Sequence, residues 1–479
     1  MTRKFFQIGF NKCGTTFIAK LFQMNGIPTL HWLEGRLAED IAYSKLVGRR
    51  PLMPWADSVT AFTDMESVRY LNMPVVEAFK EFEFLDQSYP GSVFLLNTRN
   101  VEDWVISRYM HRDGTYARAY AQILGVQTGD LADIWADAWQ DHLATCRAYF
   151  ADRPEFIEID IDDAQPGDYR EALAPWFDLP DCPKPPGRRR KQVRRGYLMR
   201  LDRMLTPSTR ADGITEADRD RVAEMLAMAA RPATVSCGAR SGGAASFDAA
   251  SGQVTDCDGT PLPLMRAGDG WYHLDPARLD LLPLANAVND IAQITDRGVY
   301  CLDPRADRQE ADYPVLAPTR KRGARNVFLW PMAWSHRLGN NGYLGNPDRA
   351  ESSWADKLDQ PIDSDASQDE VLSHRFIVSR GADPNFLACA NSDSVILRQD
   401  DWVEDALSII FQPWQHVIPL SGEAGSLQAQ LGWARANPSK SQQIAANARR
   451  LCMILADPQV RRRQLSQVLR DYRIATGQE

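Results

Sequence analysis

The chain of 479 residues is 44% hydrophobic and 25% charged. That hydrophobic fraction is typical of a globular protein, and a chain of this length is expected to form about two or three domains. Its net charge of −8 provides no broad basic field, which argues against nucleic acid or an anionic membrane as a partner.

Residues 5–16, FFQIGFNKCGTT, pass from an apolar run into a turn rich in glycine and threonine. The apolar residues between positions 5 and 10 lack helical spacing and predict a buried strand, and the following FIAKLFQMNG predicts a helix that ends before Gly26. A strand, a glycine turn and a helix in this order form an anion site, because N–H groups at the start of a helix point toward the preceding turn.

The order of residues in this turn distinguishes it from an ATP-binding loop. Gly9 and Gly14 keep the glycine spacing of GxxxxGK[ST], but Lys12 precedes the second glycine, which argues against a kinase or an ATPase. The order Gly-x-x-Lys-x-Gly-Thr-Thr resembles the 5′-phosphosulfate loop of sulfotransferases, which use 3′-phosphoadenosine 5′-phosphosulfate (PAPS) as sulfuryl donor. The resemblance implies an α/β fold with a P-loop-like parallel sheet and flanking helices. It implies that the donor is bound by Lys12, Cys13, Gly14, Thr15 and Thr16.

A second motif is VFLLNTRNVEDWVISRYMHR, residues 93–112. It predicts a buried strand over 93–96, a turn, and a helix over 103–109. Arg99 and Ser107 stand eight positions apart, as in the 3′-phosphate site of sulfotransferases. Arginine gives a phosphate a planar fork of donors, and a serine hydroxyl fills a remaining acceptor. These two side chains are therefore expected to hold the 3′-phosphate of the donor.

A third stretch agrees with the first two. Residues 134–161 predict an amphipathic helix, a break at Arg153-Pro154 and a strand over 156–161. The same succession occurs in one bacterial and fungal sulfotransferase subfamily, whose closing segment resembles ALAPWFDLPDCPKPP, residues 172–186. The resemblance covers about residues 3–190.

Sulfuryl transfer needs a cation at the bridging oxygen, because charge grows on the leaving phosphate, and a base for the acceptor hydroxyl. Lys12 is the expected cation. No metal is expected, because a transferred sulfonate carries less negative charge than a phosphoryl group. The acceptor is expected to be a sugar or a small hydroxylated compound, which no motif identifies further.

Two stretches offer a base in regions where sulfotransferases generally place one. TLHWLEGR contains His31 and Glu34, and AFTDMES contains Asp64 and Glu66. His31 is the first choice, since an imidazole titrates near neutral pH without special tuning, and Asp64 is the second.

The composition changes in the middle of the chain. The basic run GRRRKQVRR, residues 187–195, fits a solvated linker, a lid over the donor or a contact for an acidic acceptor. A helix is predicted after Thr215, with Thr215 as N-cap and Asp218 at the capping-box position. Residues 237–246 have the composition of a flexible connector, and the Asp-Gly turns beyond them predict small hairpins. The expected divisions are a sulfotransferase domain over 1–205, a helix and linker over 206–249, and a second domain over 250–479.

Residues 373–420 alternate short apolar runs with helical patterns. The pattern predicts a second, Rossmann-like α/β domain with a parallel sheet. The expected strands cover 376–378, 395–397 and 416–420, and the expected helices cover 386–390 and a segment near 402–409.

The run from 374 to about 450 resembles the last part of the lipopolysaccharide-modifying and protein O-glycosyltransferase family, which has two Rossmann-like domains. The resemblance implies a nucleotide-sugar site formed by Gly381, Asp383, Asn385 and Ser394. His416, at the start of a strand, is expected to be structural.

The strand that carries a catalytic arginine in that family is expected to be absent between Trp354 and Phe376. Nucleotide-sugar binding is therefore expected to survive without efficient transfer. Arg375, Arg380 and Arg398 lie near the recognisable motif and could substitute for the missing arginine.

Eight cysteines are scattered along the chain without a CxxC pair, and no histidine cluster has metal-ligand spacing. This pattern is typical of a reduced protein. The first residues lack the apolar region of a signal peptide, and no apolar run approaches the roughly twenty residues that span a bilayer. The sequence predicts a cytoplasmic protein without a membrane span.

Three hypotheses follow. The first is a PAPS-dependent sulfotransferase fused to a glycosyltransferase-like module. The second is a bifunctional enzyme of envelope polysaccharide modification, in which one half adds a sugar and the other a sulfate. The third is a non-catalytic protein that binds a nucleotide or a glycan.

Overall fold

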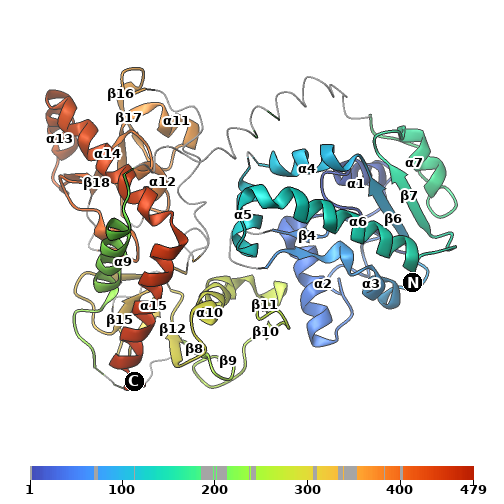
Figure 1. The fold of residues 1–479 in the computed structure, drawn as a ribbon, viewed down its shortest axis with the longest axis horizontal. Coiled ribbons are helices and arrows are strands. Elements are labelled where there is room, and N and C mark those ends of the chain that lie inside the picture. The colour runs from blue at the N-terminus through green and yellow to red at the C-terminus, as the bar shows by residue number, and fades with distance from the viewer. Residues whose placement is uncertain are drawn as a thin grey trace. The chain divides into compact units, whose positions relative to one another are not determined.

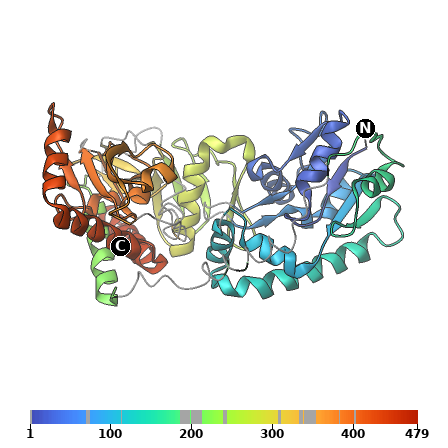
Figure 2. The same cartoon turned by 90° about the horizontal axis from the view of Figure 1, so that it is seen from above.

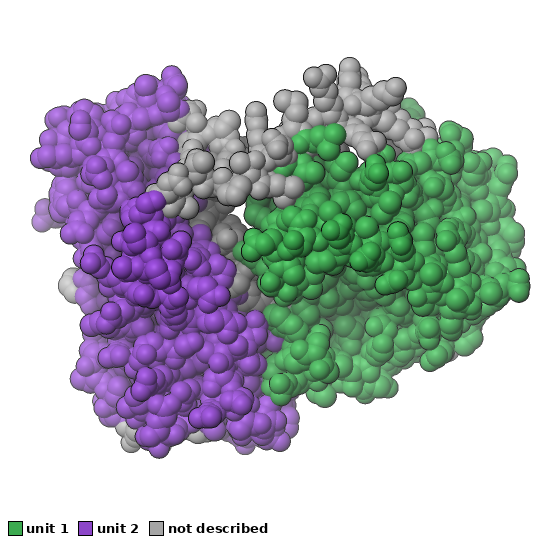
Figure 3. Space-filling model, viewed as in Figure 1, with its two compact units in different colours: residues 1–69, 73–207, 263–279 green, residues 70–72, 208–262, 280–479 purple. Residues whose placement is uncertain are grey.

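The computed structural model describes residues 3–68, 74–112, 114–184, 198, 201, 213–236, 238, 244–305, 310–332, 338, 353–381, 383–399 and 403–479. The chain forms two compact units, which Figure 3 shows in green and purple. Unit 1 contains residues 1–69, 73–207 and 263–279, and unit 2 contains residues 70–72, 208–262 and 280–479. Residues 263–279, assigned from the sequence to the second domain, thus belong to unit 1.

Both units are mixed α/β, with a five-stranded parallel sheet in unit 1 and a four-stranded parallel sheet in unit 2. None of the helices in the described part of the chain combines the length and the apolar character that a bilayer-spanning segment requires. The basic run 187–195 and most of the expected connector, residue 237 and residues 239–243, lie outside the described residues.

The sheet of unit 1 has the strand order β2-β3-β1-β6-β7, and every neighbouring pair is parallel. Phe5 of β1 is in register with Ala61 of β3 on one side and with Val93 of β6 on the other, so β1 is the central strand. The strands are β1 (Phe5–Gln7), β2 (Thr29–His31), β3 (Ala61–Thr63), β6 (Val93–Thr98) and β7 (Phe156–Asp160).

Helices cover both faces of this sheet, as Figures 1 and 2 show. They are α1 (Thr15–Met24), α2 (Arg36–Val47), α3 (Phe82–Ser88), α4 (Val101–Tyr109), α5 (Thr115–Leu124), α6 (Leu131–Tyr149) and α7 (Pro166–Leu173). The expected stop of the first helix is confirmed, because Gly26 follows the C-cap Asn25 with a left-handed φ of 69°.

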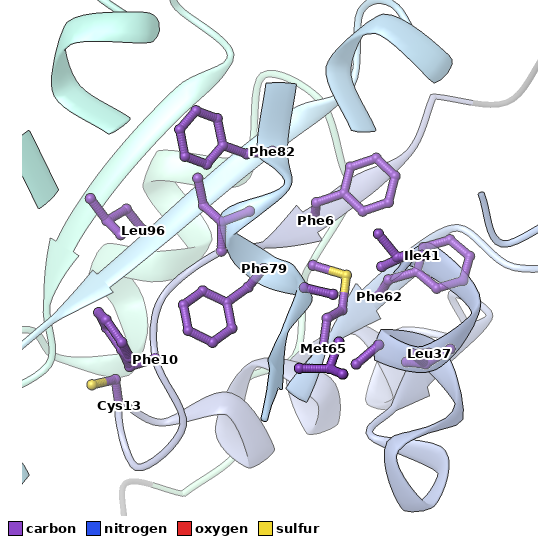
Figure 4. Close-up of a cluster of buried hydrophobic side chains, with 14 of the residues drawn as sticks. Phe6, Phe10, Cys13, Leu37, Ile41, Phe62, Met65, Phe79, Phe82 and Leu96 are labelled. Carbon is purple, nitrogen blue, oxygen red and sulfur yellow. The ribbon is translucent and has the colours of Figure 1, made fainter. Parts of the chain in front are cut away.

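Alternation along the strands divides the core of unit 1 between the two faces. Phe5 and Leu95 pack with Leu21 of α1 and Leu173 of α7 on one face. The cluster on the other face, part of which Figure 4 shows, combines strand residues with side chains of α2, α3 and α6. Its strand members include Phe6, Phe62 and Leu96.

Two hairpins complete unit 1. The first joins β4 (Glu66–Ser67) to β5 (Val76–Glu77), and the second joins β10 (Leu264–Arg266) to β11 (Tyr272–Leu274). The second is one of the hairpins predicted after the connector, and its Tyr272 is 1% exposed. Asp275, just beyond it, forms an ion pair of 3.3 Å with Arg49, which follows α2. The 3₁₀ turns of unit 1 are η1 (Leu33–Gly35), η2 (Ala78–Lys80) and η3 (Thr128–Asp130).

Unit 2 contains a mixed sheet and a parallel sheet. The mixed sheet has the order β15-β13-β12-β8-β9, and the parallel sheet has the order β16-β17-β18-β20. The strands of the mixed sheet are β8 (Ala245–Asp248), β9 (Gln253–Thr255), β12 (Val299–Leu302), β13 (Val315–Ala317) and β15 (Val327–Leu329). Those of the parallel sheet are β16 (Leu358–Asp363), β17 (His374–Arg380), β18 (Val395–Gln399) and β20 (Ile418–Leu420).

The helices of unit 2 are α9 (Glu216–Ala230), α10 (Leu282–Ile294), α11 (Gln368–Leu372), α12 (Phe386–Ala390), α13 (Ser426–Ala436), α14 (Pro438–Leu455) and α15 (Pro458–Ala475), with 3₁₀ turns η5 (Pro276–Leu281) and η8 (Ser408–Ile410) near them in sequence.

The capping box predicted at Thr215 is confirmed, since its hydroxyl accepts from Asp218 N–H at 3.2 Å and the Asp218 carboxylate accepts from Thr215 N–H at 2.9 Å.

One prediction for unit 2 is wrong. The helix expected near 402–409 is instead strand β19 (Val403–Asp405), paired with β14 (Thr319–Lys321), followed by η8. The Asp405 carboxylate accepts from the N–H groups of Leu407 and Ser408 at 2.9 and 2.8 Å, which favours a tight turn over a helix.

The segment between Trp354 and Phe376, from which the arginine-carrying strand was expected to be absent, contains an edge strand that the sequence did not predict. Strand β16 lies there, parallel to β17, and its sequence LDQPID contains no arginine. Five of its six residues are exposed because it is an edge strand, so it lacks the apolar alternation that identifies a strand in a sequence.

Candidate functional site

The candidate site lies at the carboxyl edge of the parallel sheet of unit 1. His31 ends β2, Asp64 follows β3, the loop 8–14 follows β1, and Arg99 follows β6. Because the strands are parallel, their carboxyl ends share one edge of the sheet. The chain reverses its direction of progress across the sheet at β1, and ligands of open parallel sheets bind at such a position.

The loop 8–14 is held close to the neighbouring strand. A Cβ at Gly9 would stand 2.7 Å from the backbone oxygen and 2.8 Å from the backbone nitrogen of Asn97, so only glycine fits there. Gly14, the N-cap of α1, has a left-handed φ of 85°. Lys12 also has a positive φ, of 64°, which is uncommon for a residue with a side chain. The loop therefore depends on both glycines that the sequence motif requires.

Buried side chains of α4 and α6 hold the loop through hydrogen bonds. The Arg108 guanidinium donates to Asn11 Oδ1 at 3.0 Å, and the Trp104 indole donates to the Asn11 carbonyl at the same distance. His142 on α6 donates from Nε2 to the Ile8 carbonyl at 2.7 Å. Burial lowers the pKa of His142 to about 4, so this ring is neutral at pH 7. The side chains of Phe10 and Cys13, labelled in Figure 4, anchor the loop in the apolar cluster.

Arg108 is itself fully buried and contacts the carboxyl groups of two glutamates. It contacts Glu66 at 3.3 Å and Glu77 at 2.8 Å. Burial raises the pKa of Glu66 to about 7, and the neighbouring Glu77 and Asp64 add to this effect against the attraction of Arg108. Burial also opposes ionisation of Glu77, but Arg108 and Lys80 outweigh it and lower the pKa of that carboxyl to about 2. Glu66, one of the candidate bases, therefore lies under the loop as part of its support.

Arg99 connects β6 to the loop. Its Nη1 donates to the Lys12 carbonyl oxygen at 2.9 Å, while its Nε is buried and has no hydrogen-bond partner among the described residues. Ser107 lies on α4, half-buried, next to Arg108. The structure thus brings Arg99 to the loop, and it places Ser107 on the helix that supports the same loop.

The Lys12 ammonium contacts a histidine that the sequence motifs did not indicate. Lys12 Nζ donates to Nδ1 of His111 at 2.9 Å. Burial lowers the pKa of Lys12 against the opposing effect of Asp64 and Glu66. Burial, Lys12 and Arg112 lower the pKa of His111 to about 4, so its neutral ring accepts this hydrogen bond. No local pattern could reveal a contact between residues 99 positions apart.

His31 faces the other side of the loop, and its hydrogen bonds define its tautomer. The Thr63 hydroxyl donates to the Leu30 carbonyl at 3.3 Å and therefore accepts from Nδ1–H of His31 at 2.9 Å. Nε2 is left with its lone pair, 3.4 Å from the Thr16 hydroxyl at the start of α1. A histidine in this state can accept a proton from a group bound beside the loop.

Asp64 lies 3.7 Å from the same Nε2 atom through its Oδ2. Burial raises the pKa of Asp64 against the opposing effect of His31 and Lys12. The first and second choices for the base thus form a pair, in which a carboxylate can stabilise a protonated imidazole. Glu34 is exposed and lies in η1 beyond them.

Strained backbone is concentrated at this site. Positive φ angles occur at Lys12, at the three successive residues 32–34, at Asp64 and at Arg112. Such conformations cost about 1–3 kcal/mol each and persist where the surrounding structure enforces them, most often at functional sites. Strained residues therefore occur in the loop itself and in three other segments of the site.

Three of the four residues expected to bind a nucleotide sugar come together in unit 2, and Ser394 lies apart from them. Gly381, Asp383 and Asn385 follow the carboxyl end of β17, where the Asp383 carboxylate accepts from Ser379 Oγ at 2.7 Å and from Asn385 N–H at 2.8 Å. Ser394 precedes β18, is 1% exposed and donates to the carbonyl of His374, which begins β17. The length of β17, about 20 Å, separates Ser394 from the other three.

Other side chains singled out in unit 2 have structural contacts. Arg375 Nε donates to the Trp354 carbonyl at 2.8 Å, Arg398 donates to Ser408 Oγ at 3.0 Å, and Arg380 pairs with Asp363. His416 Nδ1 accepts from the N–H of Gln412 at 3.0 Å, as expected for a structural histidine.

The described residues include no group of three or more His, Cys, Asp or Glu side chains placed to hold a metal ion. Comparison with protein-family profiles and with curated protein sequences returned no match.

Proposed function

We propose that unit 1 is a PAPS-dependent sulfotransferase, which transfers a sulfuryl group to a hydroxyl of a sugar or a small molecule. The observation that supports this proposal most strongly is that Lys12, Arg99 and the His31–Asp64 pair lie together at one glycine loop. These groups come from four strand ends and supply the anion cradle, the cation and the base that the reaction requires.

The donor would be held by both motifs. The N–H groups of residues 12–16 and the hydroxyls of Thr15 and Thr16 face the 5′-phosphosulfate, and Arg99 with Ser107 takes the 3′-phosphate. The unpartnered Nε of Arg99 supports this assignment, because a buried donor without a partner is costly unless a ligand satisfies it. We also assign the sheet of unit 1, with its loop after the central strand, to the P-loop-like type.

In the proposed reaction the acceptor oxygen attacks sulfur, and the bond between sulfur and the bridging phosphate oxygen breaks. The electron pair of that bond stays on the departing 3′-phosphoadenosine 5′-phosphate, where Lys12 stabilises the charge. His31 Nε2 takes the proton of the acceptor hydroxyl, and Asp64 stabilises the imidazolium. The His111 ring holds the Lys12 ammonium in the absence of donor.

The test uses the full chain. Calorimetry measures binding of 3′-phosphoadenosine 5′-phosphate, and transfer from ³⁵S-labelled PAPS is followed with a panel of sugars and phenols. Binding of the nucleotide with labelled product supports the proposal. Binding without transfer to any member of the panel would favour the non-catalytic hypothesis. Absence of binding would refute the sulfotransferase and any role in binding this nucleotide.

We infer that unit 2 is a Rossmann-like, glycosyltransferase-like module with reduced transfer. Asp383 and Asn385 at a carboxyl sheet edge support nucleotide-sugar binding, and the occupation of Arg375, Arg380 and Arg398 in structural contacts supports the loss of transfer. Incubation with a panel of nucleotide sugars, with and without acceptor extracts, tests this. Acceptor-dependent release of nucleotide diphosphate, abolished by Asp383→Ala, would establish the bifunctional enzyme instead.

A further inference from the structure

A tryptophan and an arginine stack beside the candidate site. The guanidinium carbon of Arg112 lies 4.9 Å from the ring centre of Trp32. Trp32 follows His31 directly, and Arg112 follows His111 directly. Each of the two stacked residues is thus the chain neighbour of a histidine that contacts either Lys12 of the loop or Thr16 of α1.

These contacts form a series that begins at Lys12 and ends at Thr16. Lys12 touches His111 at 2.9 Å, and the chain passes from His111 to Arg112. Arg112 stacks on Trp32, and the next residue back along the chain, His31, reaches Thr16 at 3.4 Å. Thr16 lies in the first turn of α1, the helix that directly follows the loop. The stacked pair therefore lies beside the site, each of its members one residue removed from a histidine of the series.

The positive charge of Arg112 is not balanced by a carboxylate among the described residues. Arg112 is exposed and forms no ion pair with a carboxylate among the described residues. Its charge acts on the site, since it lowers the pKa of both Lys12 and His111. Stacking uses the flat face of a guanidinium and leaves its N–H groups free to bind a planar anion in a forked geometry.

We propose that Arg112, positioned by Trp32, binds a carboxylate of the acceptor, so that the enzyme selects hydroxylated sugars that carry an acidic group. The proposal rests on the sulfotransferase function. In-line transfer requires donor and acceptor on opposite sides of the sulfur, and we place the acceptor on the side of the Trp32–Arg112 pair. The loop, Lys12 and Arg99 already bind the phosphates of the donor in the proposed complex. No group of the donor is therefore assigned to the guanidinium of Arg112. The strained backbone of residues 32–34 and of Arg112 supports a functional role for this pair.

The experiment compares two acceptors that differ only in the acidic group, 4-nitrophenyl β-D-glucuronide and 4-nitrophenyl β-D-glucoside. Transfer from labelled PAPS is measured for the parent, Arg112→Gln and Arg112→Lys, and binding of 3′-phosphoadenosine 5′-phosphate is measured for each. Arg147→Gln is the matched control, because Arg147 is an exposed arginine paired with Glu158 on α6 and β7.

The parent is expected to favour the glucuronide at least about tenfold in kcat/KM, the value of one charge-assisted hydrogen bond. Arg112→Gln should lose this preference mainly through KM, Arg112→Lys should keep part of it, and neither should change nucleotide affinity more than about twofold. Trp32→Phe should retain more of the preference than Trp32→Ala, as expected of a positioning residue.

Equal use of both acceptors by the parent, transfer to neither while the nucleotide binds, or weaker nucleotide binding in Arg112→Gln would each overturn the proposal. Weaker nucleotide binding in Arg112→Gln would place Arg112 in the donor-binding site. Failure of the parent to bind the nucleotide is a different outcome, because it removes the sulfotransferase function and the acceptor site with it.

Discussion

An N–H of the Arg99 guanidinium donates a hydrogen bond of 2.9 Å to the carbonyl oxygen of Lys12, which ties the end of β6 to the loop after β1. Arg99→Ala removes this tie and the proposed 3′-phosphate ligand. Calorimetry should show the affinity for 3′-phosphoadenosine 5′-phosphate reduced by about 1.5–3 kcal/mol, the value of a charge-assisted hydrogen bond. Arg147→Ala, on the exposed surface, should bind as the parent does. Unchanged affinity in Arg99→Ala would remove Arg99 from the donor site.

Gly9→Ala tests the close approach of the loop to Asn97. The added Cβ meets backbone atoms at 2.7 and 2.8 Å, which cannot move as a side chain can, so the loop must shift. Overpacking of this kind costs about 1–3 kcal/mol, and both the unfolding free energy and the nucleotide affinity should fall. Gly167→Ala on α7 is the control, because a Cβ there meets nothing within 4 Å. Equal behaviour of the two variants would contradict the assigned role of Gly9.

Lys12→Ala tests the cation. The rate of transfer should fall by about 10²–10³, as when one stabilising donor is removed from a developing charge, while binding of the product nucleotide changes less. Addition of EDTA should leave the parent's rate unchanged, since Lys12 supplies the positive charge. Undiminished turnover in Lys12→Ala, or complete dependence on a divalent ion, would refute this assignment.

His31→Asn and Asp64→Asn test the base pair. His31→Asn should lower kcat by about 10²–10⁴ and remove the decline of rate at acid pH, because a protonated imidazole cannot accept the proton of the acceptor. Asp64→Asn should have a smaller effect, since the carboxylate acts through His31. A normal rate and pH profile in His31→Asn would transfer the role to Asp64.

Glu66 and Glu77 should respond to pH in opposite ways. The pKa of Glu66 is raised to about 7 by burial, so its contribution to stability is full below about pH 4.5 and is lost as pH rises through 7. Glu66→Gln stays neutral, and its stability relative to the parent should rise by up to about 3 kcal/mol between pH 5 and 8.

Glu77→Gln is the matched comparison. Arg108 and Lys80 hold the pKa of Glu77 at about 2 despite its burial, so its contribution is present above about pH 4.5 and is lost as pH falls toward 2. The variant should lose about 3 kcal/mol at pH 7, because Arg108 remains buried with less compensation. Urea unfolding at several pH values measures both effects. If the stability of both variants responded to pH in the same way, the raised pKa of Glu66 and the lowered pKa of Glu77 would be contradicted.

The sequence was sufficient where structure depends on local chemistry. Gly9 and Gly14 are required by a close approach and a left-handed φ, and such requirements restrict residue type at fixed spacing. The apolar run at 93–96 lies in β6, and residues 5–7 of the run at 5–10 form β1, whereas residues 8–10 belong to the loop; all residues of both strands are buried. The capping box at Thr215 involves only its own turn of helix. Each of these features could be predicted because it is specified within a few residues.

Other parts of the site depend on contacts between distant segments. His111 and Arg108 reach the loop from about 100 residues away, and their roles are set by packing that no spacing records. Edge strand β16 is exposed on both faces and therefore has no apolar pattern. Ser394 fits a family motif by spacing, but its place at the start of β18 separates it from Asp383 by the length of the neighbouring strand.

The hairpin of β10 and β11 belongs to unit 1, although more than fifty residues of unit 2 precede it in the chain. The first unit is therefore interrupted in sequence and needs a segment that is synthesised late. Truncation after residue 207 would leave Arg49 without Asp275 and remove the buried Tyr272. Expression of the amino-terminal half alone would produce an incomplete protein. A shortened chain that rejoins residues 263–279 to this half through a short linker would restore the missing piece.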